Sequence, residues 1–543
     1  FFKQKTAYEI PKRDWSSGRV LFRSIKYNDA YLELMGVPLA YTPYFSHPDG
    51  TVQRQSGFLA PEFKSSSSVG QLISVPYYIV IDDSSDATVE PIFVFGEMPV
   101  MAGEYRQRTA RGQFQGSASL THVDRRDDNN HRLPDKDTRG HIKANGRFDI
   151  DDDWHWGFQG ERATDDTYLQ RYRLLQRYRF LSSQTLTSNV YTEGFRDTNY
   201  AAMNGYAFQG LRQNDDPGLA PLVLPTMDYN YVSNPGEYGG RYSFDANALS
   251  IYRSEGTRTQ RTVLRGKWSL PWMAPSGEIY TLSTALRGDL YNTDQIGSAV
   301  DPYRPTEDGL HSRAIPQMDL SWRYPLIRRD GGVRTIVEPI ASFVATPNIG
   351  NQRRFPNEDS RALQFDETNL FRPSRFDGLD RIEGGQHVNY GINSTFLRNN
   401  GRNASLFLGQ SYRLQNESAF PANSGLAKGQ SHYVGRVSIS PHPWFAARYN
   451  FQVDQHDFAA QQNRASISIG PSALRTSFNY IYVDSLGLSN AGRGVEQLGT
   501  TIDGRLSPNW RTQIRYLTSL ADEDPGSLTW GGTLIYEDEC LLA

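Results

Sequence analysis

The fold is decided where the chain reads Arg54-Gln55-Ser56-Gly57-Phe58-Leu59-Ala60-Pro61-Glu62-Phe63. Before this stretch lies a short, aromatic-rich segment, and after it strand-like runs continue to the last residue. The next run, residues 72–79, carries Pro76 in its middle. Proline has no N–H to give to a sheet ladder, so it is normally confined to edge strands, bulges or strand starts. Two successive strands with internal prolines therefore indicate a seam where strand pairing is weak.

The composition favours a strand-rich protein and leaves a membrane barrel open. The 543 residues carry a net charge of −3 and include 31 Tyr, 27 Phe, 9 Trp and 47 Gly. The mean hydropathy is −0.59, and no window has the long apolar run of a membrane helix. Transmembrane barrels have polar interiors and long outer loops, so they need not be hydrophobic overall. The near-neutral charge argues against nucleic acid as a main partner.

Alternation of apolar and polar residues dominates from Gly57 onward. In residues 142–150 every second side chain is polar or charged, and in 282–290 the alternate positions are Ser283, Ala285, Arg287 and Asp289, which is typical of strands with one wet face. In a membrane barrel the apolar face meets lipid and the polar face meets the lumen. We expect these residues to face the lumen: Lys143, Asn145, Arg147, Asp149, Arg287 and Asp289. We expect these to face lipid: Ile142, Phe148, Leu286 and Leu290.

Short and long connections alternate along the chain, as they do in outer-membrane barrels. Tight turns near 151–153, 329–332, 399–401, 441–443 and 507–509 are separated by longer polar links near 125–137, 294–312, 348–384, 416–430 and 485–494. Threading strands between them predicts an all-β fold, a large antiparallel transmembrane β-barrel over residues 55–543 with about 24 strands. Several tryptophans lie close to the turns, as in an interfacial girdle, although aromatic residues also simply suit strands: Trp154, Trp156, Trp272, Trp444 and Trp510.

The N-terminal residues divide into two expected parts. Residues 1–24 resemble a translated sequencing adapter, and we exclude them from the fold as a non-native segment. Residues 25–54 read as the last strands of a truncated β domain, punctuated by Gly36, Pro38 and Pro43. Such a piece is too small to bury a core of its own.

No set of residues predicts catalysis, a metal site or a cofactor. His122, His141 and His155 lie among acidic residues, but their spacing matches no metal triad. The run 151–153 consists of aspartates, which fit a hairpin turn better than a calcium site. We therefore expect a protein that is not an enzyme.

Several short motifs resemble the LptD (OstA/Imp) family of lipopolysaccharide-assembly proteins. They cover the chain from about residue 25 to its end and lie at 36–45, 54–59, 75–78, 86–88, 103–106, 356–360, 369–371 and 376–381. The resemblance implies a periplasmic β-jellyroll, here reduced to residues 25–54, joined to a very large barrel in the outer membrane of a Gram-negative bacterium. It also implies an LptE-type plug lipoprotein and an LptA-type periplasmic bridge as partners.

The same resemblance gives the weak seam a role. In the family, lipopolysaccharide leaves the jellyroll and enters the outer leaflet through a lateral gate between the first and last barrel strands. Pro61 and Pro76 match the family's prolines in the first two strands. This chain departs from the family pattern because most of the jellyroll is absent and about two of some 26 strands are expected beyond Ala543.

The single cysteine, Cys540, is either free or bonded outside this chain. In the resembling family a cysteine at this place is bonded to the N-terminal domain. The matching cysteine is missing here, so we expect Cys540 to be unpaired in this chain.

Two other kinds of protein fit parts of the pattern. A passive porin or a plugged, receptor-type transporter would share the barrel, but a porin should lack internal prolines in its first strands. A soluble β-repeat protein would share the strands, but the sequence has no fixed repeat period.

Overall fold

The computed structural model describes residues 2–3, 24–34, 37–48, 54–59, 61–66, 68–95, 97–126, 132–178, 184–212, 214–294, 308–348, 354–360, 364–415, 420, 424–426, 429–484, 494–521 and 525–536. Nearly all regular structure in these ranges is antiparallel β-sheet. Strands β4–β30 belong to one sheet with the topology of a large barrel, which confirms the predicted fold class. They fall into two compact units, described separately below.

A small three-stranded sheet stands apart in the topology from the barrel strands. β2 (Ser24–Leu34) and β3 (Val37–Pro48) form a hairpin, and β1 (Phe2–Lys3) pairs with β2. The assignment of residues 1–24 as foreign and of 25–54 as a jellyroll remnant stays a prediction.

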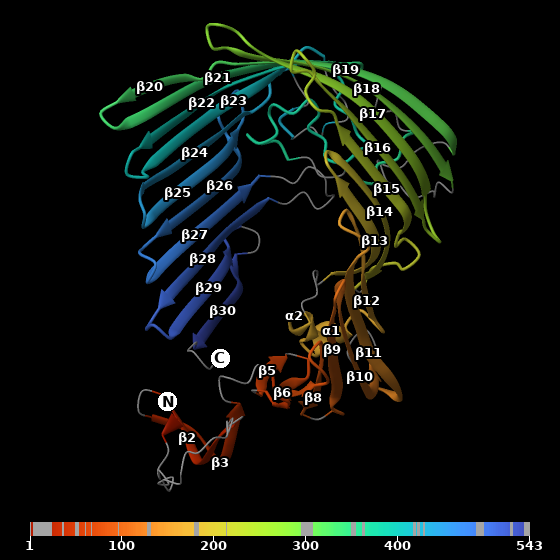
Figure 1. The fold of residues 1–543 in the computed structure, drawn as a ribbon, viewed down its shortest axis with the longest axis vertical. Coiled ribbons are helices and arrows are strands. Elements are labelled where there is room, and N and C mark those ends of the chain that lie inside the picture. The colour runs from red at the N-terminus through yellow and green to blue at the C-terminus, as the bar shows by residue number, and fades with distance from the viewer. Residues whose placement is uncertain are drawn as a thin grey trace, which may run out of the picture. The chain divides into compact units, whose positions relative to one another are not determined.

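The first unit comprises residues 1–150, 156–188 and 209–215. Its barrel strands are β4 (Gly57–Phe58), β5 (Glu62–Ser66), β6 (Gly70–Ser74), β7 (Tyr77–Val80), β8 (Ser85–Val94), β9 (Val100–Thr109), β10 (Gly112–Arg126), β11 (Arg132–Asp149) and most of β12 (Trp154–Ala163). Two four-residue helices follow, α1 (Tyr168–Arg171) and α2 (Leu174–Arg177). Figure 1 shows them beside the strands of this unit. Among the described residues no helix has the length and apolarity needed to cross a membrane.

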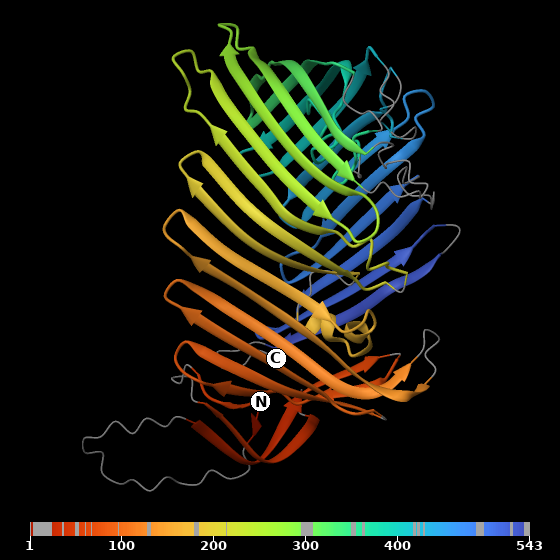
Figure 2. The same cartoon turned by 90° about the vertical axis from the view of Figure 1, so that its right-hand side faces the viewer.

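The second unit contains the remaining residues. β13 (Thr185–Arg196) begins in the first unit and ends here, and β14 (Asn199–Gly210) lies mainly here. The others are β15 (Leu222–Val232), β16 (Arg241–Tyr252), β17 (Arg258–Met273), β18 (Ile279–Asp294), β19 (Gly309–Arg323), β20 (Leu326–Asp330), β21 (Val333–Thr346), β22 (Gly385–Arg398), β23 (Asn403–Arg413), β24 (Tyr433–His442), β25 (Phe445–Val453), β26 (Ala460–Ile469), β27 (Leu474–Val483), β28 (Val495–Arg505), β29 (Trp510–Ser519) and β30 (Gly526–Tyr536). Figure 2 shows the long strands of this unit as antiparallel neighbours.

Three strands of the large sheet are interrupted, so the 27 barrel segments correspond to 24 strands in the described part of the chain. β19 and β20 both pair with β21, and the partners Met318↔Ala345 and Leu326↔Val337 share one register across the break before Pro325. β4 with β5, and β6 with β7, are likewise the two halves of single strands. The predicted number was about 24.

Aromatic side chains gather at the short-turn end of the sheet. In the second unit, Trp272 stacks on Tyr280 with ring centres 5.2 Å apart, next to the turn at 274–278. Trp510 and Tyr536 also lie in contact, with ring centres 4.9 Å apart and their planes tilted by 57°. This arrangement suits an interface between lipid and water, where amphipathic rings are favoured.

Candidate functional site

The first two barrel strands break at the predicted prolines. Pro61 lies between β4 and β5, and Pro76 lies between β6 and β7. β4 pairs with β7 over two residue pairs, while β5 pairs with β6 over five. The register shifts by one residue between the two halves of this hairpin, because Phe58 faces Tyr77 but Glu62 faces Ser74. The prolines therefore stand at one level of the sheet, although their role in a gate stays a proposal.

Hydrogen bonding at this level is one-sided. The amide of Leu59 donates to the carbonyl oxygen of Pro76 over 2.9 Å. In an antiparallel hydrogen-bonded pair each residue donates to the other, but Pro76 has no N–H to return. The pair between the first two strands is therefore held by one bond instead of two.

Sequence reasoning missed a third proline at the same level. Pro91 lies in β8, and the amide of Val75 donates to its carbonyl oxygen over 3.2 Å. Here too the return bond is absent, because Pro91 cannot donate to Val75. The signal was present in the sequence, since Pro91 lies within the strand-like run 85–94. In the structure β8 continues through this proline without a break.

Arg54 anchors the start of the first strand. Its guanidinium donates to the carbonyl oxygens of Asp83 at 2.8 Å and Ser85 at 3.2 Å, and it pairs with the carboxylate of Asp86 at 2.5 Å. Asp82 caps the same turn by accepting bonds from Ser84 and Ser85, and these bonds lower the pKa of the Asp82 carboxyl to about 2. The junction before Gly57 is thus tied to the turn between β7 and β8.

The segment 164–178, which follows β12, packs against the first strands. Its apolar side chains Leu169 and Leu174 join Leu72 of β6 and Val94 of β8 in a buried cluster. Its polar groups reach the same strands. Arg177 pairs with both Glu62 and Glu90, and Arg171 pairs with Glu97. We call residues 164–178 the strap.

The residues of β11 expected in the lumen lie on the strap's side of the strand. Lys143 pairs with Glu161 of β12 at 3.1 Å. Asn145 lines a polar hollow of about 500 Å³ together with Arg54. Arg147 and Asp149 are exposed.

On β18, Asp289 is buried and accepts bonds from Arg287 at 2.7 Å and Arg313 at 2.6 Å. Both arginines also donate to backbone oxygens of the loop at 379–380. The structure therefore brings Arg287 and Asp289 together in one polar cluster.

The residues expected in lipid lie on the other face. Ile142, Leu286 and Leu290 are 58%, 61% and 46% exposed. Phe148 stacks on Trp156 with ring centres 5.0 Å apart. Which face meets lipid and which meets the lumen stays a prediction for all ten residues.

Sequence reasoning did not foresee that the connection between β21 and β22 folds onto the strands. In its described residues, Asp380 is fully buried and accepts bonds from Arg261 at 2.6 Å and from the Tyr291 hydroxyl at 2.9 Å. The amides of Glu358 and Asp359 donate to its other oxygen. Every oxygen of this carboxylate is therefore satisfied, as a buried charge requires.

A second buried ion cluster holds the other end of this connection. Glu383 accepts bonds from Arg375 and Arg413, and Arg375 also donates to Ser411 at 2.9 Å. Burial raises the pKa of the Glu383 carboxyl, but Arg375 and the neighbouring cations outweigh burial and hold that pKa below its usual value. Both clusters join the connection to strands of the second unit.

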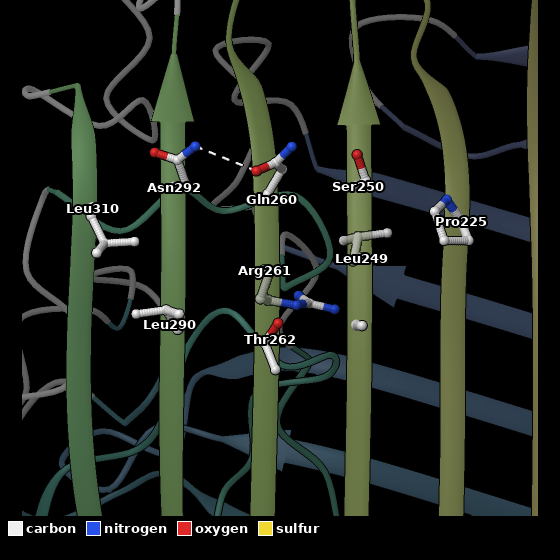
Figure 3. A pocket seen from close by; sticks show the side chains of 10 residues that line it. Pro225, Leu249, Ser250, Gln260, Arg261, Thr262, Leu290, Asn292 and Leu310 are labelled. Atoms are coloured by element: carbon white, nitrogen blue, oxygen red, sulfur yellow. Dashed lines mark hydrogen bonds between the residues drawn. The ribbon is translucent and has the colours of Figure 1, made fainter.

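Figure 3 shows a shallow hollow of about 560 Å³ over β15–β19. Leucines and Pro225 line it beside Gln260 and Asn292, whose side chains bond each other at 3.3 Å. Arg261 is the one titratable residue of this lining, and its carboxylate partners are Asp359 and Asp380. The hollow has no residue set for acid–base or nucleophilic chemistry.

The three histidines considered above are separate from one another. His141 bonds Ser119 at 2.6 Å, His155 bonds Glu193 at 2.5 Å, and His122 bonds Thr138 at 3.2 Å. Over the described ranges, no group of three or more His, Cys, Asp or Glu side chains is placed to hold a metal ion. Cys540 lies outside the described residues.

The long antiparallel strands, the exposed apolar face and the aromatic rows define an outer-membrane β-barrel. The family LPS transport system D, LptD, matches residues 137–510, and the chain belongs to this family.

Curated relatives are LPS-assembly proteins LptD. The protein of Methylococcus capsulatus is 27% identical over 68% of this chain and 34% of its own length. The protein of Pseudomonas aeruginosa is 26% identical over 71% of this chain and 44% of its own length. The protein of Idiomarina loihiensis is 23% identical over 89% of this chain and 62% of its own length. The chain thus spans between about one third and two thirds of these relatives. Among solved structures, the siderophore receptor PirA from Pseudomonas aeruginosa aligns with a TM-score of 0.31 at 10% identity, over 85% of this chain and 79% of that one.

Proposed function

We propose that this chain carries lipopolysaccharide across the outer membrane and inserts it into the outer leaflet through a lateral opening at its first strands. The observation that carries the proposal is the interruption of the first two strands at Pro61 and Pro76 in a chain of the LptD family. The prolines remove hydrogen bonds where a sideways opening would need the sheet to part.

The cost of exposing backbone groups to lipid favours an edge that already has few hydrogen bonds to break. A strand edge that opens in the bilayer exposes backbone N–H and C=O groups, and each unsatisfied group costs several kcal/mol. A gate must therefore keep the number of broken bonds small. Pro76 lacks the donor that would return the bond of Leu59, so the first hairpin has one hydrogen bond fewer that resists bending beside the opening.

The proposed partners are those that the family resemblance implies. We propose an LptE-type lipoprotein as a plug and an LptA-type periplasmic bridge that delivers lipopolysaccharide through a jellyroll. Residues 25–54 would be the end of that jellyroll next to the barrel. A passive porin or receptor-type transporter is the less favoured alternative, because the matched family is named for lipopolysaccharide transport.

Retention of lipopolysaccharide tests the proposal. The intact protein, purified in detergent and exchanged repeatedly into fresh micelles, should retain lipopolysaccharide, and depletion of the protein from cells should reduce newly made lipopolysaccharide at the surface. A porin of similar size is the matched control. Loss of lipopolysaccharide at the rate seen for the porin, together with unchanged surface delivery after depletion, would contradict the proposal.

A further inference from the structure

The prolines at the seam form one line across three neighbouring strands, and this line defines a possible axis of bending. Pro61 stands opposite Val75 in the register of β5 with β6, and Val75 bonds Pro91 of β8. The register of β6 with β8 continues unchanged into β7 with β8, since Ser74 faces Ile92 and Tyr77 faces Val89. The line therefore passes between β6 and β7 at a place where both strands keep the same register with β8.

Different contacts hold the two sides of this line. On the side of β4 and β7, Arg54 ties the chain to Tyr78 at 3.1 Å and to Asp86 at 2.5 Å. On the side of β5 and β6, residues 72–74 pair with residues 92–94 of β8, and the strap supplies the side-chain contacts. We call β5 and β6, residues 62–66 and 70–74, the flap.

The strap holds the flap by charge and by apolar packing. Arg177 pairs with Glu62 of the flap and with Glu90, which is 3% exposed and directly precedes Pro91. The hydroxyl of Ser66 donates to the carbonyl oxygen of Arg171 over 2.9 Å. Leu72 of the flap lies buried with Leu169 and Leu174 of the strap.

The strap is also tied to strands beyond the flap. Asp165 binds Arg139 of β11 through two hydrogen bonds, at 2.5 and 2.8 Å. The hydroxyl of Tyr168 bonds Ser119 of β10 at 2.7 Å. The strap therefore has one attachment on β10–β11, where the ladder is long and regular, and another on the flap.

We propose that the flap swings about the line Pro61–Pro76–Pro91, and that the strap holds it closed, with Arg177 as the positioning residue. The inference rests on the proposed function, because it assigns the opening motion of the lipopolysaccharide gate to the flap. β5 and β6 move as one unit because five residue pairs join them. Pro91 extends the weak line to the third strand, so residues 92–94 of β8, which pair with β6, move with them.

Hydrogen exchange of the intact protein in detergent micelles tests whether the strap holds the flap, and it does not depend on lipopolysaccharide transport. Arg177→Gln should speed amide exchange over 70–74 roughly fivefold, the factor that corresponds to losing about 1 kcal/mol of ion pairing. Exchange in β10 and β11 should not change. Arg173→Gln, at an exposed position in the same strap, is the matched control and should leave both regions unchanged.

Adding a hydrogen bond at Pro91 tests the proposed hinge line by strengthening the contact between β8 and its neighbour instead of weakening one. Pro91→Ala supplies an N–H that faces the carbonyl oxygen of Val75, so exchange at the Val75 amide should slow roughly fivefold, the effect of about 1 kcal/mol for one added hydrogen bond. Unchanged exchange in both Arg177→Gln and Pro91→Ala would overturn the flap and its strap.

Cross-linking tests whether movement of the flap away from the strap is needed for transport. Cysteines at Glu62 and Arg177, bridged by a thiol-cleavable bis-maleimide, should stop delivery of lipopolysaccharide to the surface until the linker is cleaved. Cysteines at His122 and Thr138, which face each other across β10 and β11 outside the strap and the flap, should leave delivery intact when bridged in the same way. Normal delivery with the first pair bridged would overturn the inference. Failure of the proposed function is distinguishable, because the unmodified protein would then deliver no lipopolysaccharide while the exchange effects persist.

Discussion

Val75 donates its amide hydrogen to the carbonyl oxygen of Pro91 over 3.2 Å, and Pro91 has no hydrogen with which to return the bond. The neighbouring pair, Leu59 with Pro76, has the same one-sided bond. Pro271 in β17 leaves its strand uninterrupted. Pro325 also stands at a break, between β19 and β20, where the amide of Tyr324 donates to the carbonyl oxygen of Pro339 over 3.1 Å. The first strands differ because three successive strands carry a proline at one level, and this difference can be tested by mutation.

Replacing Pro61 and Pro76 together by alanine should tighten the first hairpin and slow export. Each hydrogen bond restored should contribute about 1 kcal/mol. The measurement is lipopolysaccharide at the cell surface, with antibiotic susceptibility as a second readout, after the wild-type protein is depleted. Pro271→Ala is the control, because its proline lies alone in a continuous strand. A double variant with normal permeability and normal surface lipopolysaccharide would count against the seam.

The predicted faces of β11 and β18 can be checked by cysteine labelling. A water-soluble maleimide should label cysteines placed at Lys143, Asn145 or Arg287 and not those at Ile142 or Leu286. As a second measure, Leu286→Arg should destabilise the folded barrel in lipid by about 2–4 kcal/mol near the midplane. The reverse labelling pattern would invert the assignment of lumen and lipid.

Acid should loosen the strap where Asp165 holds it. Burial raises the pKa of the Asp165 carboxyl, but its bonds to Arg139 outweigh burial, so its pKa in the folded protein lies below the usual value. A lowered folded pKa gives stability that is complete above about pH 5 and is lost as the pH falls through the usual aspartate pKa of about 3.9 and below. Proteolysis over 164–178 should therefore speed up toward pH 3. In Asp165→Asn the rate at pH 7 should already be high and should change less with pH, and an equal pH response in both proteins would refute the assignment.

The connection between β21 and β22 should depend on Asp380. Asp380→Ala leaves Arg261 without one of its two carboxylates, and breaking a buried pair typically costs about 3–5 kcal/mol. We expect faster proteolysis at 354–383 and a lower unfolding temperature. Asp377→Ala, in the same connection with a side chain that is 67% exposed, should have a small effect. Equal effects of the two substitutions would contradict the buried network.

Cys540 should be oxidised when the N-terminal domain that the family resemblance implies is present. The resemblance implies a disulfide between Cys540 and that domain, and such bonds persist in an oxidising compartment. A maleimide should label Cys540 only after reduction. Free labelling without reductant would show that the disulfide implied by the family resemblance is absent.

Local pattern was enough to predict the strands, because alternation and turn residues are properties of neighbouring positions. The breaks at Pro61 and Pro76 follow from the missing N–H of each proline. The strap and the connection at 354–383 could not be predicted in this way. Their ion pairs join residues far apart in the chain, 115 positions for Glu62 with Arg177 and 119 for Arg261 with Asp380. No period or motif in either segment encodes such a partner.

The central claim, that lipopolysaccharide passes at the first strands, is tested most directly by site-specific photocross-linking. Phe58 of β4 and Phe396 of β22 are both exposed, 76% and 44%, so a benzoylphenylalanine replaces an exposed aromatic side chain at either position. We predict lipopolysaccharide adducts at Phe58 that grow with ongoing lipopolysaccharide synthesis, and few at Phe396. Equal adducts at the two positions, or none at Phe58, would contradict lateral passage at the first strands.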